Sequence, residues 1–242
     1  MPRPIDPAVR LTFSRKLRAW YKRNARDLPW RRTRDAYQVL VSELMLQQTQ
    51  VSRVVDYYGE FLDRFPTLAH VARAKPAAVM EAWEGLGYYA RARNLHRLAI
   101  SVTDGGARTD SQLPAEPEAL RALPGIGAYT AGAVASFAYE RRAALVDTNV
   151  ARVLYRIFVG NGDPKAHAMK AHLWEVSRAV LPHRHVFDFN QALMDFGATV
   201  CSARKPLCGE CPMARGCVTL ASAAPPARRR LQAAAGSRDR TR

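Results

Sequence analysis

The sequence predicts an all-α protein. Apolar residues recur at intervals of three and four along much of the chain, as they do on one face of a helix. No segment alternates apolar and polar residues with the period of two that a half-buried strand shows, so we expect essentially no sheet. All four cysteines lie after residue 200, which predicts a separate cysteine-rich loop beyond most of the helices.

The individual helices follow from this periodicity in chain order. The first runs from 7 to 24, where Val9, Phe13 and Leu17 share one face. A later helix begins at Val51 and ends before Pro66, because proline cannot continue a helix. The other expected helices cover 36–47, 76–83, 89–103, 116–122, 128–138, 148–159, 165–181 and 187–198. Loops marked by Gly, Pro, Asp and Arg are expected at 25–35, 104–115, 139–146 and 160–164.

The end of the chain, residues 222–242, has a different composition. It is rich in alanine, proline and arginine and contains few large apolar residues. Such a segment cannot bury enough apolar surface to offset the entropy of ordering, so we expect a disordered basic tail.

Charge and hydropathy narrow the class of partner. The formal net charge of the 242 residues is +16, and so basic a balance favours an anionic partner, with nucleic acid first. No apolar run is long enough to span a membrane, and the first residues are too polar for an export signal. We therefore expect a cytoplasmic, nucleoid-associated protein with no membrane partner.

The cysteines have the spacing Cys201-x6-Cys208-x2-Cys211-x5-Cys217. Four thiolates at short, uneven intervals on one loop can close around a single inorganic centre, either a [4Fe–4S] cluster or, less often, a zinc ion. Two disulfides are the alternative, but disulfides persist in oxidising compartments and no export signal is visible. The spacing predicts a metal centre.

A glycine-rich turn lies between two short helical patterns at Leu123-Pro-Gly-Ile-Gly-Ala-Tyr-Thr130. Gly125 and Gly127 allow a tight turn, and Ile126 can anchor that turn in the core. The amide groups at the start of the second helix, including Thr130, then face outward and can bind a DNA phosphate without reading sequence. An ordinary helical turn would also use glycine and proline.

Three strings accompany this turn: LPWR from Leu28, SELMLQQTQV from Ser42 and GLGYYARARNL from Gly85. With the cysteine loop they resemble the helix-hairpin-helix DNA glycosylases of the endonuclease III superfamily, and within it adenine DNA glycosylases of the MutY type. That family removes adenine mispaired with guanine or 8-oxoguanine. The resemblance covers about residues 10 to 220.

The resemblance implies two helical lobes and a monomer bound to double-stranded DNA containing a mispaired adenine. A six-helix module would span 29–137, with the hairpin at about 116–138. A second domain, formed by 1–28 together with 138–221, would carry the [4Fe–4S] cluster, and DNA would lie in the cleft between the lobes.

Adenine release needs an acid for the leaving base and a stabiliser for the cationic sugar, a division of labour that two carboxylates can make. Glu43 lies in an apolar helical run, and the resemblance implies that it protonates adenine N7. Asp147 would stabilise the sugar cation, and Asn149 would position water or sugar. A solvated glutamate and a helix-capping aspartate are the structural alternatives.

Tyr129 bears on the type of glycosylase. In bifunctional relatives a lysine occupies this position and attacks the sugar as a Schiff-base nucleophile. A tyrosine cannot do so, and the resemblance therefore implies a monofunctional enzyme that leaves the strand intact. A simple aromatic at the start of a helix is the alternative for Tyr129.

The resemblance also implies how the flipped base and the duplex are held. The base pocket would consist of Leu28, Trp30, Arg31, Leu46 and Gln191, although Trp30 could equally be a core residue. Gln48 and Tyr88 would wedge into the duplex, with Thr49 beside them, although Tyr88 could equally be a packing residue. Arg91 and Arg93 would contact phosphate, as would Arg204 and Lys205 in the cysteine loop.

The sequence departs from the family pattern at two points, and three alternative functions stay open. The family continues beyond the cysteine loop into a domain that inspects 8-oxoguanine, and we expect this domain to be absent here, which leaves the preference for 8-oxoguanine undecided. The family pattern also allows glutamate at the position of Gln191, which leaves the role of Gln191 open. The rivals are a mismatch thymine or uracil glycosylase of the same superfamily, a non-catalytic iron–sulfur DNA-binding protein and a bifunctional nicking lyase.

Overall fold

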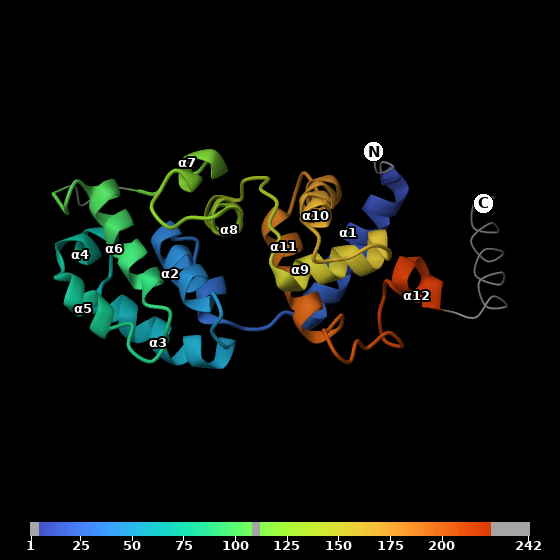
Figure 1. Ribbon diagram of the computed structural model, residues 1–242, viewed down its shortest axis with the longest axis horizontal. Helices are drawn as coiled ribbons and strands as arrows, with labels where there is room; N and C mark the ends of the chain where they lie inside the picture. The colour runs from blue at the N-terminus through green and yellow to red at the C-terminus, as the bar shows by residue number, and fades with distance from the viewer. Residues whose placement is uncertain (1–4, 108–111, 224–242) are drawn as a thin grey trace. The chain divides into compact units, whose positions relative to one another are not determined.

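A computed structural model describes residues 5–107 and 112–223. Within these ranges the secondary structure is helical and contains no strand, which confirms the all-α prediction. The chain divides into two compact units (Figure 1). One consists of residues 27–143, and the other combines the described residues up to Arg26 with those from Ala144 onward.

The 27–143 unit is built around one apolar helix. Its elements are η1 (Pro29–Arg31), α2 (Ala36–Leu46), α3 (Val51–Arg64), α4 (Leu68–Arg73), α5 (Pro76–Glu81), α6 (Ala90–Thr103), α7 (Pro117–Arg121) and α8 (Ala128–Tyr139). Helix α2 packs against α3, α6 and α8, and Leu40, Val41 and Met45 are fully buried. Helices α4 and α5 pack against α6 (Figure 1).

Small residues let α8 approach α2 closely. Ala131, Ala133 and Ala135 on α8 have no exposed surface, and the helix is buried along most of its length. Helix α2 begins at a fixed point because Asp35 caps it, accepting a hydrogen bond from the Gln38 amide at 2.8 Å. Burial and cap together fix the register of the SELMLQQTQV segment.

The second unit joins the first helix to the last ones. Its elements are α1 (Pro7–Asn24), α9 (Thr148–Leu154), the π-helical turn η2 (Tyr155–Val159), α10 (His167–Val180), α11 (Val186–Thr199), η3 (Ala214–Gly216) and α12 (Val218–Ala223). Helix α1 packs against α10 and α11. Phe13 of α1 makes edge-to-face contacts with Phe158 and Phe189 at centroid distances of 5.0 and 6.0 Å.

Most expected helices are present, with instructive differences. Helix α4 was not expected; Thr67 caps it, and Leu68 and Val71 are buried. The helix expected over 148–159 becomes the π-helical turn after Leu154. Of the expected tail, Ser222 and Ala223 belong to α12, and the rest lies outside the described residues.

The module expected over 29–137 lies within the compact unit of 27–143, which begins two residues earlier and ends six residues later.

No helix in the described part of the chain is both long enough and apolar enough to cross a membrane.

Candidate active site and cysteine centre

Glu43 lies in the middle of α2, in the 27–143 unit. Its exposed fraction is 2%, and the helix residues on either side, Ser42 and Leu44, are equally buried. The solvated helix face that was the alternative for Glu43 is therefore excluded. A carboxyl at such a position is a strong candidate for acid–base chemistry, because desolvation disfavours its charged form.

Asp147 lies in the other unit and caps α9. Its Oδ1 accepts a hydrogen bond from the Val150 amide at 2.6 Å, and its Oδ2 accepts one from Asn149 Nδ2 at 3.3 Å. Burial raises the pKa of this carboxyl above its ordinary value, although both hydrogen bonds oppose the shift. Asp147 therefore fills the capping role, and its carboxyl is at the same time partly desolvated.

Arg152, one turn further along α9, connects Asn149 to the first cysteine. Its Nη2 donates to Asn149 Oδ1 at 2.7 Å and to the Gly197 carbonyl at 2.7 Å, and its Nε donates to the Cys201 carbonyl at 2.8 Å. A Cβ at Gly197 would lie only 2.8 Å from the Asn149 Cβ, so α9 and α11 can meet here because residue 197 is glycine.

The five expected base-pocket residues fall in both units. Leu28 and Trp30 are buried, Arg31 and Leu46 are half-buried, and all four belong to the 27–143 unit. Trp30 packs edge-to-face on Tyr58 at a centroid distance of 5.5 Å, which is the core role that was its alternative. Gln191 lies on α11 in the other unit.

Gln191 has an unusual environment for a polar side chain. It is 3% exposed, and its Oε1 has no hydrogen-bond partner among the described residues. An amide oxygen buried without a partner is costly, and such atoms often mark binding positions.

Gln48 and Tyr88 share a strained backbone conformation. Gln48 has a φ of 57° and Tyr88 a φ of 47°, and both side chains are exposed, Tyr88 by 59%. Left-handed φ values are rare outside glycine and collect at functional sites. Both residues line an open hollow of about 610 Å³ together with Gln47, Tyr89, Ala90, Arg91, Arg93 and Asn94.

The structure corrects one of the expected DNA contacts, that of Arg91, and shows what the side chain of Thr130 does. Arg91 is 6% exposed, and its guanidinium donates to main-chain carbonyls and to Thr49 Oγ1, so it has no donor left for phosphate. Thr130 is 2% exposed and accepts a hydrogen bond from Gln47 Nε2 at 3.3 Å, so its side chain ties α8 to the end of α2. Arg93 is exposed, as expected for a phosphate contact.

The glycine turn has the expected local form. Gly125 has a φ of +78°, Ile126 is buried, and Gly127 occupies the N-cap position of α8. Tyr129, in the first turn of α8, is half-buried. Gly127 is exposed, and no described atom lies within 4 Å of a Cβ built there, so the space around the residue that begins α8 is open.

All four cysteines line one hollow of about 280 Å³ in the second unit. They are free thiols, so the two-disulfide alternative does not hold. Four thiols around one hollow are the donor set that holds a [4Fe–4S] cluster or, less often, a zinc ion.

The electrostatics of the hollow agree with this donor set. Burial raises the pKa of the Cys211 and Cys217 thiols, and the charges of neighbouring cysteines raise them further. Positive iron atoms would remove that penalty on four clustered thiolates. Arg156 donates to the Cys201 sulfur at 3.5 Å and to the Ser202 carbonyl at 2.7 Å, which fixes the start of the loop.

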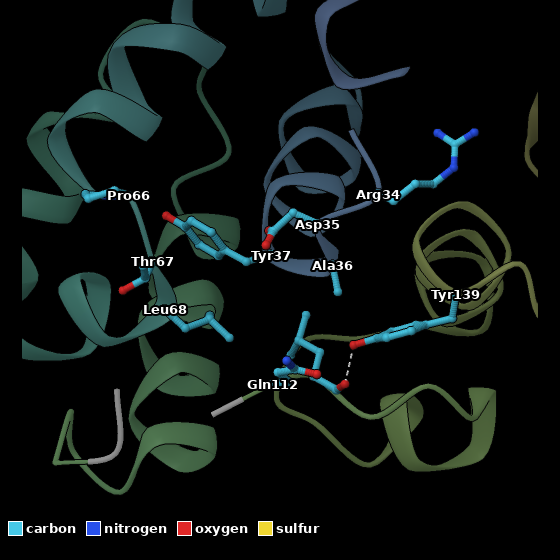
Figure 2. A pocket seen from close by; sticks show the side chains of 10 residues that line it. Arg34, Asp35, Ala36, Tyr37, Pro66, Thr67, Leu68, Gln112 and Tyr139 are labelled. Atoms are coloured by element: carbon cyan, nitrogen blue, oxygen red, sulfur yellow. Dashed lines mark hydrogen bonds between the residues drawn. The ribbon is translucent and has the colours of Figure 1, made fainter. Parts of the chain in front are cut away.

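A further hollow of about 330 Å³ lies between the start of α2 and the end of α8 (Figure 2). Its two tyrosines already have partners: Tyr37 donates to the Phe65 carbonyl at 2.5 Å, and Tyr139 donates to the Leu113 carbonyl. Asp35 at its rim caps α2. The polar groups of this hollow therefore stabilise the fold.

Sequence reasoning did not anticipate Arg152 or Asn94. Arg152 follows Asn149 by three residues, a spacing that places both on one helix face, but its other acceptors are main-chain carbonyls without a sequence signature. Asn94 lies in α6, and its side chain would lie 2.5 Å from a Cβ at Gly125.

Comparison with known families gives two matches. A model of the HhH-GPD superfamily of base excision DNA repair proteins matches residues 41–179. A model of the iron–sulfur binding domain of endonuclease III matches residues 201–217, the range bounded by the first and last cysteines.

Individual proteins are similar over most of the chain. The adenine DNA glycosylase of Rattus norvegicus is 42% identical over 221 residues, which cover 88% of this chain and 42% of that protein. The adenine DNA glycosylase of Mycobacterium tuberculosis is 44% identical over 216 residues, covering 88% and 69%. The solved structure of a thermostable thymine-DNA glycosylase has a TM-score of 0.80 at 31% identity, covering 88% and 97%. The chain thus spans less than half the length of the Rattus relative.

Proposed function

The chain belongs to the HhH-GPD superfamily of base excision DNA repair proteins and, within it, to the family of adenine DNA glycosylases, and from this premise we propose its reaction. It hydrolyses the N-glycosidic bond of an adenine that is mispaired with guanine or 8-oxoguanine in double-stranded DNA. The observation that carries this proposal is the burial of Glu43, at 2% exposure, in the centre of an apolar helix.

Glu43 acts as the general acid. Adenine leaves poorly as an anion, so the base must gain a proton as the bond to the sugar breaks. A buried carboxyl in apolar surroundings retains its proton near neutral pH more readily than an exposed one. Glu43 therefore donates a proton to adenine N7, and the base leaves as a neutral molecule.

Asp147 stabilises the positive charge that develops on the sugar. Its carboxylate is held by the Val150 amide and by Asn149, so its oxygens keep a fixed orientation. A preorganised negative charge in a partly desolvated place stabilises an oxocarbenium-like cation more than water does. Asn149, held in turn by Arg152, positions the water that attacks the sugar.

Tyr129 makes the reaction monofunctional. A tyrosine has no amine with which to form a Schiff base on the sugar, so the product is an intact strand with an abasic site. Strand breaks then appear only after alkali treatment.

The DNA is gripped through its backbone and opened by a wedge. The amides that follow Gly127 bind phosphate at the start of α8, and Arg93 adds charge nearby. Gln48 and Tyr88 enter the duplex beside the mispair as adenine leaves the stack. The flipped base lies against Leu28 and Leu46.

The cysteine loop organises a second contact with DNA. Cys201, Cys208, Cys211 and Cys217 hold the [4Fe–4S] cluster, which supplies a rigid cross-link for the loop. Arg204 and Lys205, both exposed between the first two cysteines, bind phosphate.

The test is single-turnover base release from synthetic duplexes that contain A:G, A:8-oxoguanine, T:G or U:G pairs, assayed with and without alkali. Adenine release from the first two, with breaks only after alkali, supports the proposal. Release of thymine or uracil would instead favour the mismatch glycosylase, a class to which the 31% identical thymine-DNA glycosylase belongs by name. Tight binding without release would indicate a non-catalytic DNA-binding protein.

A further inference from the structure

Arg91 is a buried arginine whose hydrogen bonds join two exposed turns of the 27–143 unit. On one side, its Nη1 donates to the carbonyls of Leu44, Met45 and Gln47 at 2.7, 2.8 and 2.5 Å. Its Nη2 donates to Thr49 Oγ1 at 3.2 Å. These acceptors surround the C-terminal end of α2 and the turn that carries Gln48.

On the other side, the same guanidinium binds the turn before α6. Its Nη2 donates to the carbonyls of Leu86 and Gly87 at 3.0 and 2.9 Å, and its Nε donates to the Tyr88 carbonyl at 3.4 Å. The guanidinium carbon also lies 5.6 Å from the ring centroids of Tyr88 and Trp83.

Each of the two turns contains one residue with a strained backbone, and in each turn that residue lies at or next to a carbonyl that Arg91 binds. Gln48, at a φ of 57°, directly follows the Gln47 carbonyl, and Tyr88, at a φ of 47°, itself supplies a carbonyl. Strained conformations of this kind persist only where the surroundings fix them. A lysine could not replace the arginine here, because an ammonium is a compact point charge that cannot bind both turns in one plane.

We propose that Arg91 is a positioning residue that holds Gln48 and Tyr88 in their strained conformations as one wedge. Both side chains then enter the duplex together when the target base leaves the stack. The inference rests on the proposed function, since it assigns Gln48 and Tyr88 to the opening of DNA. Arg91 touches neither the DNA nor the reacting atoms and acts through the two turns.

The decisive variant is Arg91→Lys, compared with Arg73→Lys as a matched control. Arg73 lies on α4 in the same unit and also holds a turn, donating from Nε and Nη2 to the Gly106 carbonyl at 2.9 and 2.7 Å. Among the described residues its hydrogen bonds go to Gly106 and not to Gln48 or Tyr88, so this exposed arginine reports the loss of a turn-holding arginine away from the wedge.

Two readouts separate positioning from general stability. The first is the fluorescence of a duplex with 2-aminopurine at the target position, which brightens when the base unstacks on protein binding. The second is the single-turnover excision rate at saturating protein. Melting temperature is recorded for every variant, so that the loss of folded protein can be excluded as the cause.

We expect Arg91→Lys to lower the excision rate about tenfold to a hundredfold, as small misplacements in an active site do, and to remove most of the fluorescence gain. Arg73→Lys, at an exposed arginine, lowers the melting temperature less than Arg91→Lys does and keeps both readouts within about twofold of wild type. Adding Tyr88→Ala to Arg91→Lys causes little further loss, because both changes disable one wedge.

The inference is overturned if folded Arg91→Lys unstacks the base as wild type does, or if the losses from Arg91→Lys and Tyr88→Ala multiply. If Arg91→Lys does not fold, Thr49→Val replaces it. This isosteric change removes a hydroxyl that accepts from Arg91 and that also donates to the Gln47 and Leu86 carbonyls, so it loosens the same two turns. Thr49→Val is then expected to weaken unstacking, and a wild-type signal from it would refute the inference.

Failure of the proposed function gives a different result. A wild-type protein that unstacks the base and releases no adenine would contradict the glycosylase assignment and leave the wedge intact. A wild-type protein that binds duplex without unstacking the base would contradict the wedge.

Discussion

Gly125 in the glycine turn faces Asn94 of α6 so closely that a Cβ on the glycine would lie 2.5 Å from the Asn94 Cβ. Real Cβ atoms do not approach other heavy atoms this closely. The φ of +78° at Gly125 adds a second reason for glycine, because other residues are strained there. The turn can therefore pack this closely against α6 only because residue 125 is glycine.

Gly127, two residues later, has open space around its Cα and no positive φ. Substitutions at Gly125 and Gly127 therefore form a matched pair. We expect Gly125→Ala to lower the free energy of unfolding by about 1–3 kcal/mol through backbone strain and displacement of Asn94. Gly127→Ala leaves stability nearly unchanged, since its added Cβ meets no described atom within 4 Å. Denaturant unfolding of both variants provides the comparison.

The same pair tests the phosphate site. Gly127→Ala places a methyl group where the DNA backbone would approach the amides of α8, so duplex affinity should fall although stability does not. Equal duplex affinity for wild type and Gly127→Ala, measured at one fixed salt concentration, would rule out close phosphate contact at this turn.

Glu43→Gln should abolish excision while DNA binding survives. Glutamine has a similar volume and fits the buried site, but it cannot give up a proton to the leaving base. We expect a rate loss of about a hundredfold to ten-thousandfold in single turnover. Affinity for the mispaired duplex serves as the control, and excision by Glu43→Gln near the wild-type rate would show that another group is the acid.

Asp147→Asn should separate function from stability. Asparagine still accepts from the Val150 amide and caps α9, so the fold is retained. Because burial raises the pKa of Asp147, the folded protein binds this proton more tightly than the unfolded chain. Thermal unfolding at neutral pH should therefore occur at the same or a higher temperature, while excision is lost; Asp147→Ala, without a cap, should cost about 1 kcal/mol.

The direction of this pKa shift also sets a pH dependence. The stability contribution of Asp147 is fully present below the ordinary pKa of 3.8 and is lost as the pH rises through the raised folded value. The excision rate should instead rise with pH over this range, because a protonated carboxyl does not stabilise a cation. We expect the acid limb of the single-turnover rate to lie above pH 3.8; a limb at or below that pH would contradict this assignment.

Tyr129→Lys should introduce a Schiff-base nucleophile at the start of α8. We expect strand breaks without alkali, and a covalent protein–DNA complex trapped by borohydride reduction. Tyr129→Phe, which keeps the ring and adds no amine, is the control and should give neither. The absence of trapped complex with Tyr129→Lys, despite continued base release, would place residue 129 away from the sugar.

Arg152→Lys should weaken excision through Asn149 and the cysteine loop together. The arginine donates at once to Asn149, Gly197 and Cys201, and lysine cannot reproduce three divergent contacts. We expect excision to fall about tenfold to a hundredfold, the usual effect of residues that support a metal site. Iron content per chain is measured in parallel; unchanged excision would show that Asn149 keeps its orientation without this arginine.

The sequence predicted the helical class and the boundaries of the long helices, because α1, α3 and α6 each show several turns of apolar periodicity. It did not reveal α4, which lacks the proline in the first turn that marks the equally short helices α5 and α7. The π-helical turn after Leu154 was not predicted either; it directly follows α9 and ends at Gly160.

For the site, the residue types that chemistry requires were readable, and their environments were not. Four cysteines at short spacings predict a metal centre in any fold, and the family match at 201–217 confirms an iron–sulfur site. Burial of Glu43 followed from its apolar neighbours on α2. The catalytic and DNA-binding roles of individual residues stay predictions.

The sequence by itself determined the all-helical class, the cysteine centre, and the strings that carry the family resemblance, because these depend on local periodicity and on the identity of a few side chains. The tertiary structure alone decided which charged side chains are exposed. Arg91 and Arg93 are two positions apart on α6, a spacing that turns one toward the core and the other toward solvent. Only the fold shows that carbonyls from two distant turns surround Arg91, since main-chain acceptors have no signature in the sequence.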